Sequence, residues 1–157
     1  MNIYTITYST PTFAVVPVGN RYYDLANDTR ILVHTSEGCM IFDFKKFFRT
    51  NFRSGGLLVD GFVDQVGDTQ KALIYLLHDA AYTPCVACNG EHPISRELAD
   101  EFLRDGLRWA GMGKFKSNVV YYSVRAFGKK AYEEDDELTE TNSNLFSFTW
   151  ASEVISC

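Results

Sequence analysis

The sequence lacks any hydrophobic run long enough to cross a membrane, and it contains few cysteines. Its longest uninterrupted apolar run, residues 72–77, is six residues long, whereas a membrane-spanning helix requires about 20. The first residues show neither the basic nor the apolar segment of a secretory signal. The four cysteines are too few and too irregularly spaced for a disulfide scaffold. We therefore expect a soluble globular domain made inside a cell, with no membrane span and with reduced thiols.

The sequence also lacks a basic excess, and its charges are unevenly distributed. Residues 1–132 hold all 15 Lys and Arg together with 13 of the 20 Asp and Glu, which gives this part a net charge of +2. Residues 133–157 hold the other seven acids and no base, which gives −7. A nearly neutral body has no electrostatic footprint for nucleic acid. We therefore expect no nucleic-acid partner, and we divide the chain into one domain at 1–132 and an acidic linker with a C-terminal arm at 133–157.

Aromatic residues make up 15% of the chain and hydrophobic residues 46%, enough for one domain with a real core. In the N-terminal half, alternation of apolar and polar residues predicts strands separated by Gly-containing turns. The predicted strands cover residues 3–8, 14–18, 21–23, 31–34, 39–44 and, as a short addition, 57–59.

The middle of the chain has apolar residues at helical spacing, bounded by residues that start and stop helices. Helices are predicted from Asp68 or Thr69 to before Pro84, from Ser95 to Gly111 or Gly113, and from Ser117 or Asn118 to Gly128. These elements indicate an α+β fold, in which an antiparallel sheet from the N-terminal half packs on two or three helices and an extended C-terminal arm follows.

The C-terminal arm begins with a run of acids at 133–137 that is typical of a solvated linker. After it, alternation places Phe146, Phe148 and Trp150 on one face of an extended segment. Burying one such aromatic side chain is worth about 1.5–3 kcal/mol, so we expect this face to be covered. It forms either an edge strand of its own sheet or an intermolecular arm that binds a partner.

The residues best suited to chemistry are His78, Asp79 and Tyr82 near the end of the first helix, and Asp100 on the second. If the two helices pack antiparallel, Asp100 approaches His78 or Tyr82. The carboxylate would then orient the imidazole, which would deprotonate a water molecule, while Asp79 would bind a hard cation. The alternative is structural, with Asp79 capping the loop and Asp100 pairing with a nearby arginine.

Three segments resemble an uncharacterised bacteriophage family whose pattern reads roughly G-F-x-T-D-x-A-S, H-D-x-x-Y and S-R-x-x-A-D. The corresponding segments here begin at Gly61, His78 and Ser95. The first departs from the pattern, because Val63 stands in place of Thr and Val-Gly in place of Ala-Ser. It keeps Asp64, a further candidate metal ligand beside Asp79 or Asp100. The resemblance implies a virion protein made in the cytoplasm of a bacterial host.

The pattern H-D-x-x-Y followed by A-D-x-x-F is also similar to secreted-type phospholipases, and more so to their viral-capsid relatives. This resemblance implies that His78 activates water, Asp79 binds calcium and Asp100 supports His78. That family also uses a Gly-rich loop whose carbonyl groups complete the calcium site. The glycines upstream of His78 do not match the spacing of that loop.

A second metal hypothesis involves Cys85, Cys88 and His92, with His78 as a possible fourth ligand. The C-x₂-C spacing is typical of one half of a structural zinc site. The sequence contains no second C-x-x-C pair. Calcium, zinc and no metal at all therefore remain alternatives.

Three functions follow from these observations. The first is a bacteriophage virion or assembly component, a tail or connector adaptor that binds other phage structural proteins or copies of itself through Phe146, Phe148 and Trp150. The second is a metal-assisted ester or phosphoester hydrolase that uses the His/Asp pair. The third is a phage protein whose acidic segment binds and inhibits a basic host factor.

Overall fold

The structure is a computed structural model, and it describes residues 1–9, 14–20, 22–51, 69–134 and 136–151. It has the expected α+β fold. The strands are β1 (Ile3–Tyr8), β2 (Val15–Gly19), β3 (Tyr22–Leu25), β4 (Thr29–Thr35), β5 (Gly38–Phe44), β6 (Arg49–Thr50) and β7 (Phe146–Ala151). The helices are α1 (Thr69–Ala81), the 3-10 turn η2 (Val86–Cys88), α2 (Arg96–Trp109), α3 (Lys114–Phe127), α4 (Lys129–Glu133) and α5 (Glu137–Asn142).

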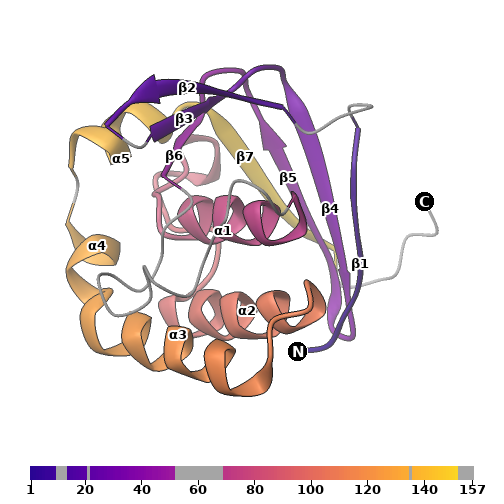
Figure 1. Cartoon of the computed structure of the whole chain (residues 1–157). Coiled ribbons are helices and arrows are strands. Elements are labelled where there is room, and N and C mark those ends of the chain that lie inside the picture. The colour runs from indigo at the N-terminus through magenta and orange to yellow at the C-terminus, as the bar shows by residue number, and fades with distance from the viewer. Residues whose placement is uncertain (10–13, 21, 52–68, 135, 152–157) are drawn as a thin grey trace.

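The strands form two antiparallel sheets, one of four strands in the order β1-β4-β5-β7 and one of three in the order β2-β3-β6 (Figure 1). The predicted hairpins are confirmed: β4 pairs with β5, and β2 pairs with β3. In the turn between β4 and β5, Gly38 has a φ of 137°, a backbone conformation that residues other than glycine rarely adopt. The strand proposed for 57–59 lies outside the described residues.

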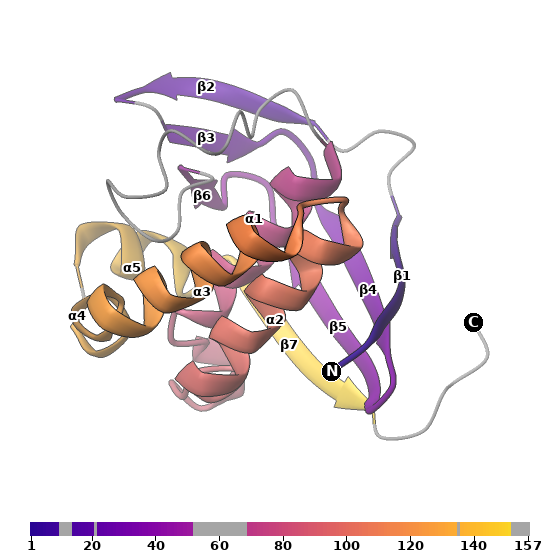
Figure 2. The ribbon, with the colours of Figure 1, turned by 60° about the horizontal axis from the view of Figure 1, so that its bottom comes forward.

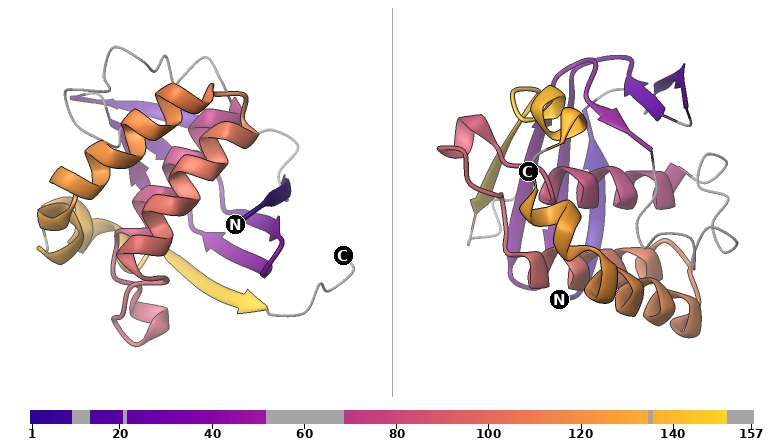
Figure 3. Two further views of the ribbon diagram at one scale, coloured as in Figure 1. Left: turned by 90° about the horizontal axis from the view of Figure 1, so that it is seen from below. Right: turned by 90° about the vertical axis from the view of Figure 1, so that its left-hand side faces the viewer.

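Helix α1 occupies the centre of the molecule, between the four-stranded sheet and the pair formed by α2 and α3 (Figures 1 and 2). Its apolar residues are buried on nearly every side, including Ile74, Leu76 and Leu77, which expose no surface. Helix α3 packs against α2 on the side away from the sheet (Figure 3). Within the described residues, no helix is long and apolar enough to cross a membrane.

The second helix begins where the sequence predicts, whereas the third begins earlier. Ser95 caps α2, and its hydroxyl accepts a hydrogen bond from the amide of Leu98 at 3.2 Å. Helix α3 starts at Lys114, so Ser117 lies inside it and is not its cap. The Ser117 hydroxyl instead donates to the carbonyl of Lys114 and accepts from Arg108 of α2. The sequence therefore predicted Ser117 as a helix cap, whereas its hydroxyl links α3 to α2.

The acidic segment, which we predicted as a solvated linker, is partly helical and exposes its described acids. It contains α4 and α5, with residue 135 between them outside the described residues. Asp136 caps α5 by accepting hydrogen bonds from the amide and the hydroxyl of Thr139. Glu133 and Glu134 pair with lysines four residues earlier on α4. Local pairing and capping thus offset the repulsion between these acids.

The aromatic arm is an intrachain strand over its described part, the first of the two predicted alternatives, and partner binding by its aromatic residues stays a prediction. Strand β7 pairs with β5 along six residues and completes the four-stranded sheet. Phe146 is 3% exposed, and its ring packs against Phe44 and Phe48. Phe148 and Trp150 are half-buried against the same core. The aromatic face is therefore covered by the chain's own body.

Candidate functional site

The site depends on an unusually close approach between α1 and α2. A Cβ atom built on Gly106 of α2 would lie 2.7 Å from Cδ1 of Ile74 on α1, closer than such atoms can pack. His78 follows Ile74 by one helical turn, and Asp100 precedes Gly106 by six residues. The end of α1 therefore lies against the beginning of α2, and the two polar side chains meet as the sequence predicted.

Asp100 is the centre of the hydrogen-bond network. Its Oδ1 lies 3.2 Å from Nε2 of His78 and accepts a hydrogen bond from the Tyr82 hydroxyl at 2.5 Å. Its Oδ2 accepts from Nη1 of Arg125 at 3.0 Å and lies 3.8 Å from Nε of Arg96. The carboxylate is fully buried and receives compensating partners on both oxygens.

These contacts set the charge of each group. Burial alone would raise the pKa of Asp100, but hydrogen bonds from His78, Tyr82 and Arg125 hold it below its ordinary value. Burial lowers the pKa of His78, and Asp100 offsets part of that effect. Burial raises the pKa of Tyr82, with Asp100 adding to the shift. At neutral pH the network therefore contains a charged carboxylate, a neutral imidazole and a protonated phenol.

One face of this network borders a cavity of about 330 Å³ between α1, α3 and the α4–α5 segment. His78 is 2% exposed, so protein encloses the imidazole almost completely, and the residue is one of those that line the cavity. An oriented, neutral imidazole at a cavity wall has the properties required of a general base. Side chains that line the cavity include Tyr22, His78, Asp79, Tyr82, Ser123, Phe127 and Asn142.

Asp79, the candidate metal ligand, is next to His78 in the chain and lines the same cavity. Its Oδ2 accepts a hydrogen bond from the Thr50 hydroxyl. Burial raises the pKa of Asp79 to about 7, with the Thr50 hydrogen bond acting in the opposite direction. Among the described residues, no three His, Cys, Asp or Glu side chains come together to hold a metal. Asp64 lies outside those residues, so the calcium hypothesis stays a prediction.

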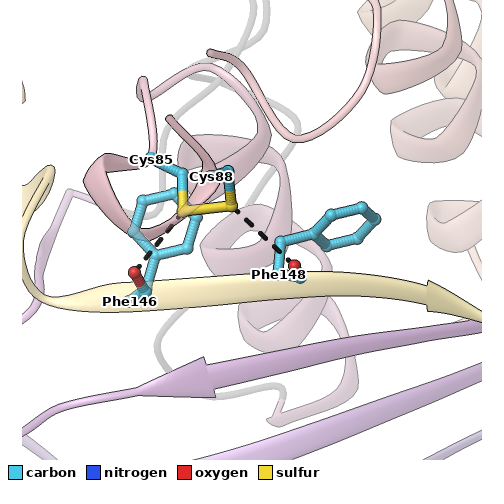
Figure 4. The surroundings of a disulfide bond; sticks show 4 residues. All are labelled: Cys85, Cys88, Phe146 and Phe148. Atoms are coloured by element: carbon cyan, nitrogen blue, oxygen red, sulfur yellow. Dashed lines mark hydrogen bonds between the residues drawn. A yellow bond between two sulfur atoms is a disulfide. The ribbon is translucent and has the colours of Figure 1, made fainter. Parts of the chain in front are cut away.

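The cysteine pair has a different arrangement from the expected one. Cys85 and Cys88 are joined in a disulfide across η2, whose tight turn brings their Cα atoms to 5.0 Å. Figure 4 shows both sulfurs facing β7, where they contact the carbonyl groups of Phe146 and Phe148. His92 is turned away from them and stacks on Tyr132, with ring centroids 3.8 Å apart. The expectation of reduced thiols is therefore wrong for this pair, and its sulfurs are not available as thiolate zinc ligands.

Several residues of the site were missed by the sequence analysis. Arg125 lies 25 residues after Asp100 and reaches it only because α3 packs on α2. Thr50 on β6 contacts Asp79 from a separate sheet. The α4–α5 segment contributes Ala131, Leu138 and Asn142 to the cavity wall, and the last two belong to the part that we expected to be a linker and arm. No local pattern marks these positions, because each is placed by packing between distant elements.

Comparison with known proteins identifies the family. The chain belongs to the family described as "Protein of unknown function (DUF1353)", whose model matches residues 25–124. The matched range contains His78, Asp79, Tyr82 and Asp100, whereas Arg125 follows directly after it. No curated protein matches the chain. No solved structure matches it either.

Proposed function

We propose that the protein is a hydrolase in which His78 acts as general base and Asp100 holds the imidazole in position. The observation that carries this proposal is the contact between Nε2 of His78 and Oδ1 of Asp100 at the wall of a cavity. This contact fixes the ring orientation and stabilises the imidazolium that forms when the ring takes a proton. Tyr82 and Arg125 keep the carboxylate in place from its other sides.

The reaction follows from these positions. His78 removes a proton from a water molecule, and the water oxygen attacks the electrophilic carbon or phosphorus of a bound ester. The bond to the leaving oxygen breaks, and the imidazolium returns the proton to that oxygen. The products are an acid and an alcohol, and His78 regains its neutral form.

Asp79 would act on the substrate from the same wall of the cavity. Because burial raises the pKa of Asp79 to about 7, a large fraction of this side chain is protonated near neutral pH. A protonated carboxyl group can donate a hydrogen bond to an oxygen on which negative charge develops. We assign Asp79 this donor role, with cation binding as the alternative that a metal titration distinguishes.

The proposal is tested by ester hydrolysis with matched histidine variants. The full chain is assayed with p-nitrophenyl butyrate and bis(p-nitrophenyl) phosphate, in the presence of Ca²⁺, Zn²⁺ or EDTA. We expect His78→Asn to lower kcat by about 10²–10⁴-fold, the usual contribution of a general base. The control is His34→Asn, because His34 is a half-buried residue of β4 outside the site.

The result is interpretable because folding is measured on the same samples. Circular dichroism spectra that match the wild type, together with loss of turnover only in the His78 variant, would support the proposal. Equal turnover in both variants, or turnover in neither the variants nor the wild type, would contradict it. Turnover that disappears in EDTA and returns with one cation would assign Asp79 to metal binding.

A virion or assembly component is the second candidate, and a separate surface favours it. Helix α3 presents exposed apolar side chains at helical spacing, those of Phe115, Tyr122 and Ala126. Phe115 is 76% exposed and Tyr122 66%, which is unusual for such side chains. This candidate predicts the protein in purified phage particles and loss of incorporation in a Phe115→Ser, Tyr122→Ser variant. A host-factor inhibitor would instead be absent from particles.

A further inference from the structure

The cavity beside His78 has a distinctive charge pattern that bears on its substrate. Its described lining includes two carboxyl side chains, those of Asp79 and Asp136, and neither lysine nor arginine. Resting on the function proposed above, we infer that the site hydrolyses acyl esters that carry no negative charge. It rejects phosphoesters and acyl groups that bear a carboxylate.

Two described arginines of the Asp100 network, Arg125 and Arg96, have other partners and are not directed toward a substrate. Arg125 donates to Oδ2 of Asp100 at 3.0 Å. Arg96 donates to the main-chain carbonyls of Val124 and Arg125, and its Nε lies 3.8 Å from the same carboxylate. Neither side chain lines the cavity within the described part of the chain. Their positive charge is therefore balanced by Asp100 rather than directed toward a ligand.

This pattern is unsuited to phosphoryl transfer. A phosphoester carries negative charge in its ground state and spreads it over three oxygens in the transition state, which enzymes stabilise with arginine, lysine or a metal ion. A like charge brought beside an ionised carboxylate is repelled. The tetrahedral state of an acyl ester develops a single oxyanion, for which hydrogen-bond donors such as a protonated carboxyl group suffice.

The remaining wall of the cavity is apolar and suits an acyl group. Val124 and Phe127 of α3 and Leu138 of α5 are among the residues that line it. Phe127 is 67% exposed, so its ring is free to cover an apolar group at the entrance. A volume of about 330 Å³ lies at the small end of the range for ligand sites. These features favour a short acyl chain next to the bond that is cleaved.

The test uses esters that share one leaving group and differ only in charge. The full chain is assayed with p-nitrophenyl butyrate, with the p-nitrophenyl monoester of succinate, with a p-nitrophenyl ester of 4-aminobutyrate and with bis(p-nitrophenyl) phosphate. We expect kcat/KM for the neutral and cationic acyl esters to exceed that for the succinate ester by at least about tenfold. The phosphodiester should not be hydrolysed above background.

A pair of matched variants shows whether the cavity charge causes this preference. Ala131 of α4 lines the cavity and is exposed, whereas Ala126 of α3 is exposed and lies outside the lining. Ala131→Lys should raise the ratio of succinate to 4-aminobutyrate kcat/KM by about three- to tenfold. Ala126→Lys introduces the same charged residue on a helix. It should leave the ratio of succinate to 4-aminobutyrate kcat/KM unchanged.

The possible outcomes separate the inference from the function on which it rests. His78-dependent hydrolysis that prefers the succinate ester or the phosphodiester would overturn the substrate assignment and leave the hydrolase standing. An identical charge preference in the Ala131→Lys and wild-type proteins would also overturn it. If no ester is hydrolysed in a His78-dependent manner, both the function and the substrate assignment fall.

Discussion

Replacing Gly106 with alanine should destabilise the protein, although alanine is the better helix former. In an unhindered helix interior the change would stabilise by about 1 kcal/mol. Here the new Cβ would meet three carbons of Ile74 at 2.7, 2.9 and 3.2 Å, whereas carbon atoms pack at about 3.5–4.0 Å. Ile74 is fully buried and has no free space to move into.

The magnitude follows from these opposing effects. Inserting a methyl group into a packed core costs about 1–3 kcal/mol, and two contacts below 3 Å place this site in the upper half of that range. After subtraction of the helix propensity we expect a net loss of about 1–2 kcal/mol. For a chain of this size the loss corresponds to a fall in Tm of about 2–8 °C. Urea unfolding followed by circular dichroism measures the free energy directly.

A second substitution tests the cause of the loss. Ile74→Val removes Cδ1, the atom nearest to the added methyl group, and alone should cost about 0.5–1.5 kcal/mol. In the Gly106→Ala background the same change should cost nothing or restore stability, which gives a coupling of about 1 kcal/mol. If Gly106→Ala raises stability, or if the two effects add without coupling, the close helix approach is wrong, and so is our account of how His78 meets Asp100.

Three further predictions concern the site and the sheet. Burial raises the pKa of Asp79 to about 7 from 3.8 in the unfolded chain. The contribution of this side chain to the free energy of unfolding is therefore at its full value below about pH 4 and falls as the pH rises to 7. The free energy of unfolding should change by at most about 1.4 kcal/mol per pH unit, and by less here because Asp79 is only partly buried. Urea unfolding at pH 5 and pH 8 measures this change. In the Asp79→Asn variant the contribution of residue 79 to the pH dependence should be absent. Asp100→Ala leaves Tyr82 and Arg125 without their partner and should cost about 3–5 kcal/mol in the same assay. Deleting residues 145–157 should abolish cooperative unfolding, because it removes Phe146 and the edge strand, whereas a dispensable arm would leave the melting curve intact.

Features that depend on neighbouring residues were predictable from the sequence. The β4–β5 hairpin follows from two apolar strands around a Gly-containing turn, and Ser95 caps α2 because its hydroxyl precedes the first free amides. The meeting of His78 with Asp100 was predictable as well, once antiparallel packing of consecutive helices was assumed. Each of these inferences needs only a local pattern and one simple rule of connection.

Features that depend on distant residues were not predictable. Strand β7 was recognisable from its alternation, but its partner β5 lies about 100 residues earlier, and no local pattern identifies it. The helices α4 and α5 were obscured for a different reason. A run of five acids dominated the interpretation of residues 133–137, although Lys129 and Lys130 stand four residues before Glu133 and Glu134. Lysines and glutamates four residues apart indicate a helix, whereas the net charge of the segment alone suggested a linker.

The network itself contains an argument about why residue 78 is a histidine. Asp100 already receives a hydrogen bond from Tyr82 and a charged one from Arg125, so its burial does not require an imidazole. An aliphatic side chain at position 78 would fill similar volume without the desolvation that lowers the pKa of His78. A buried histidine whose desolvation is unfavourable and that lies among the residues lining a cavity fits the proton-accepting role proposed above. His78→Leu should therefore keep or raise Tm while it eliminates turnover, and a marked loss of stability would show that the imidazole is structural.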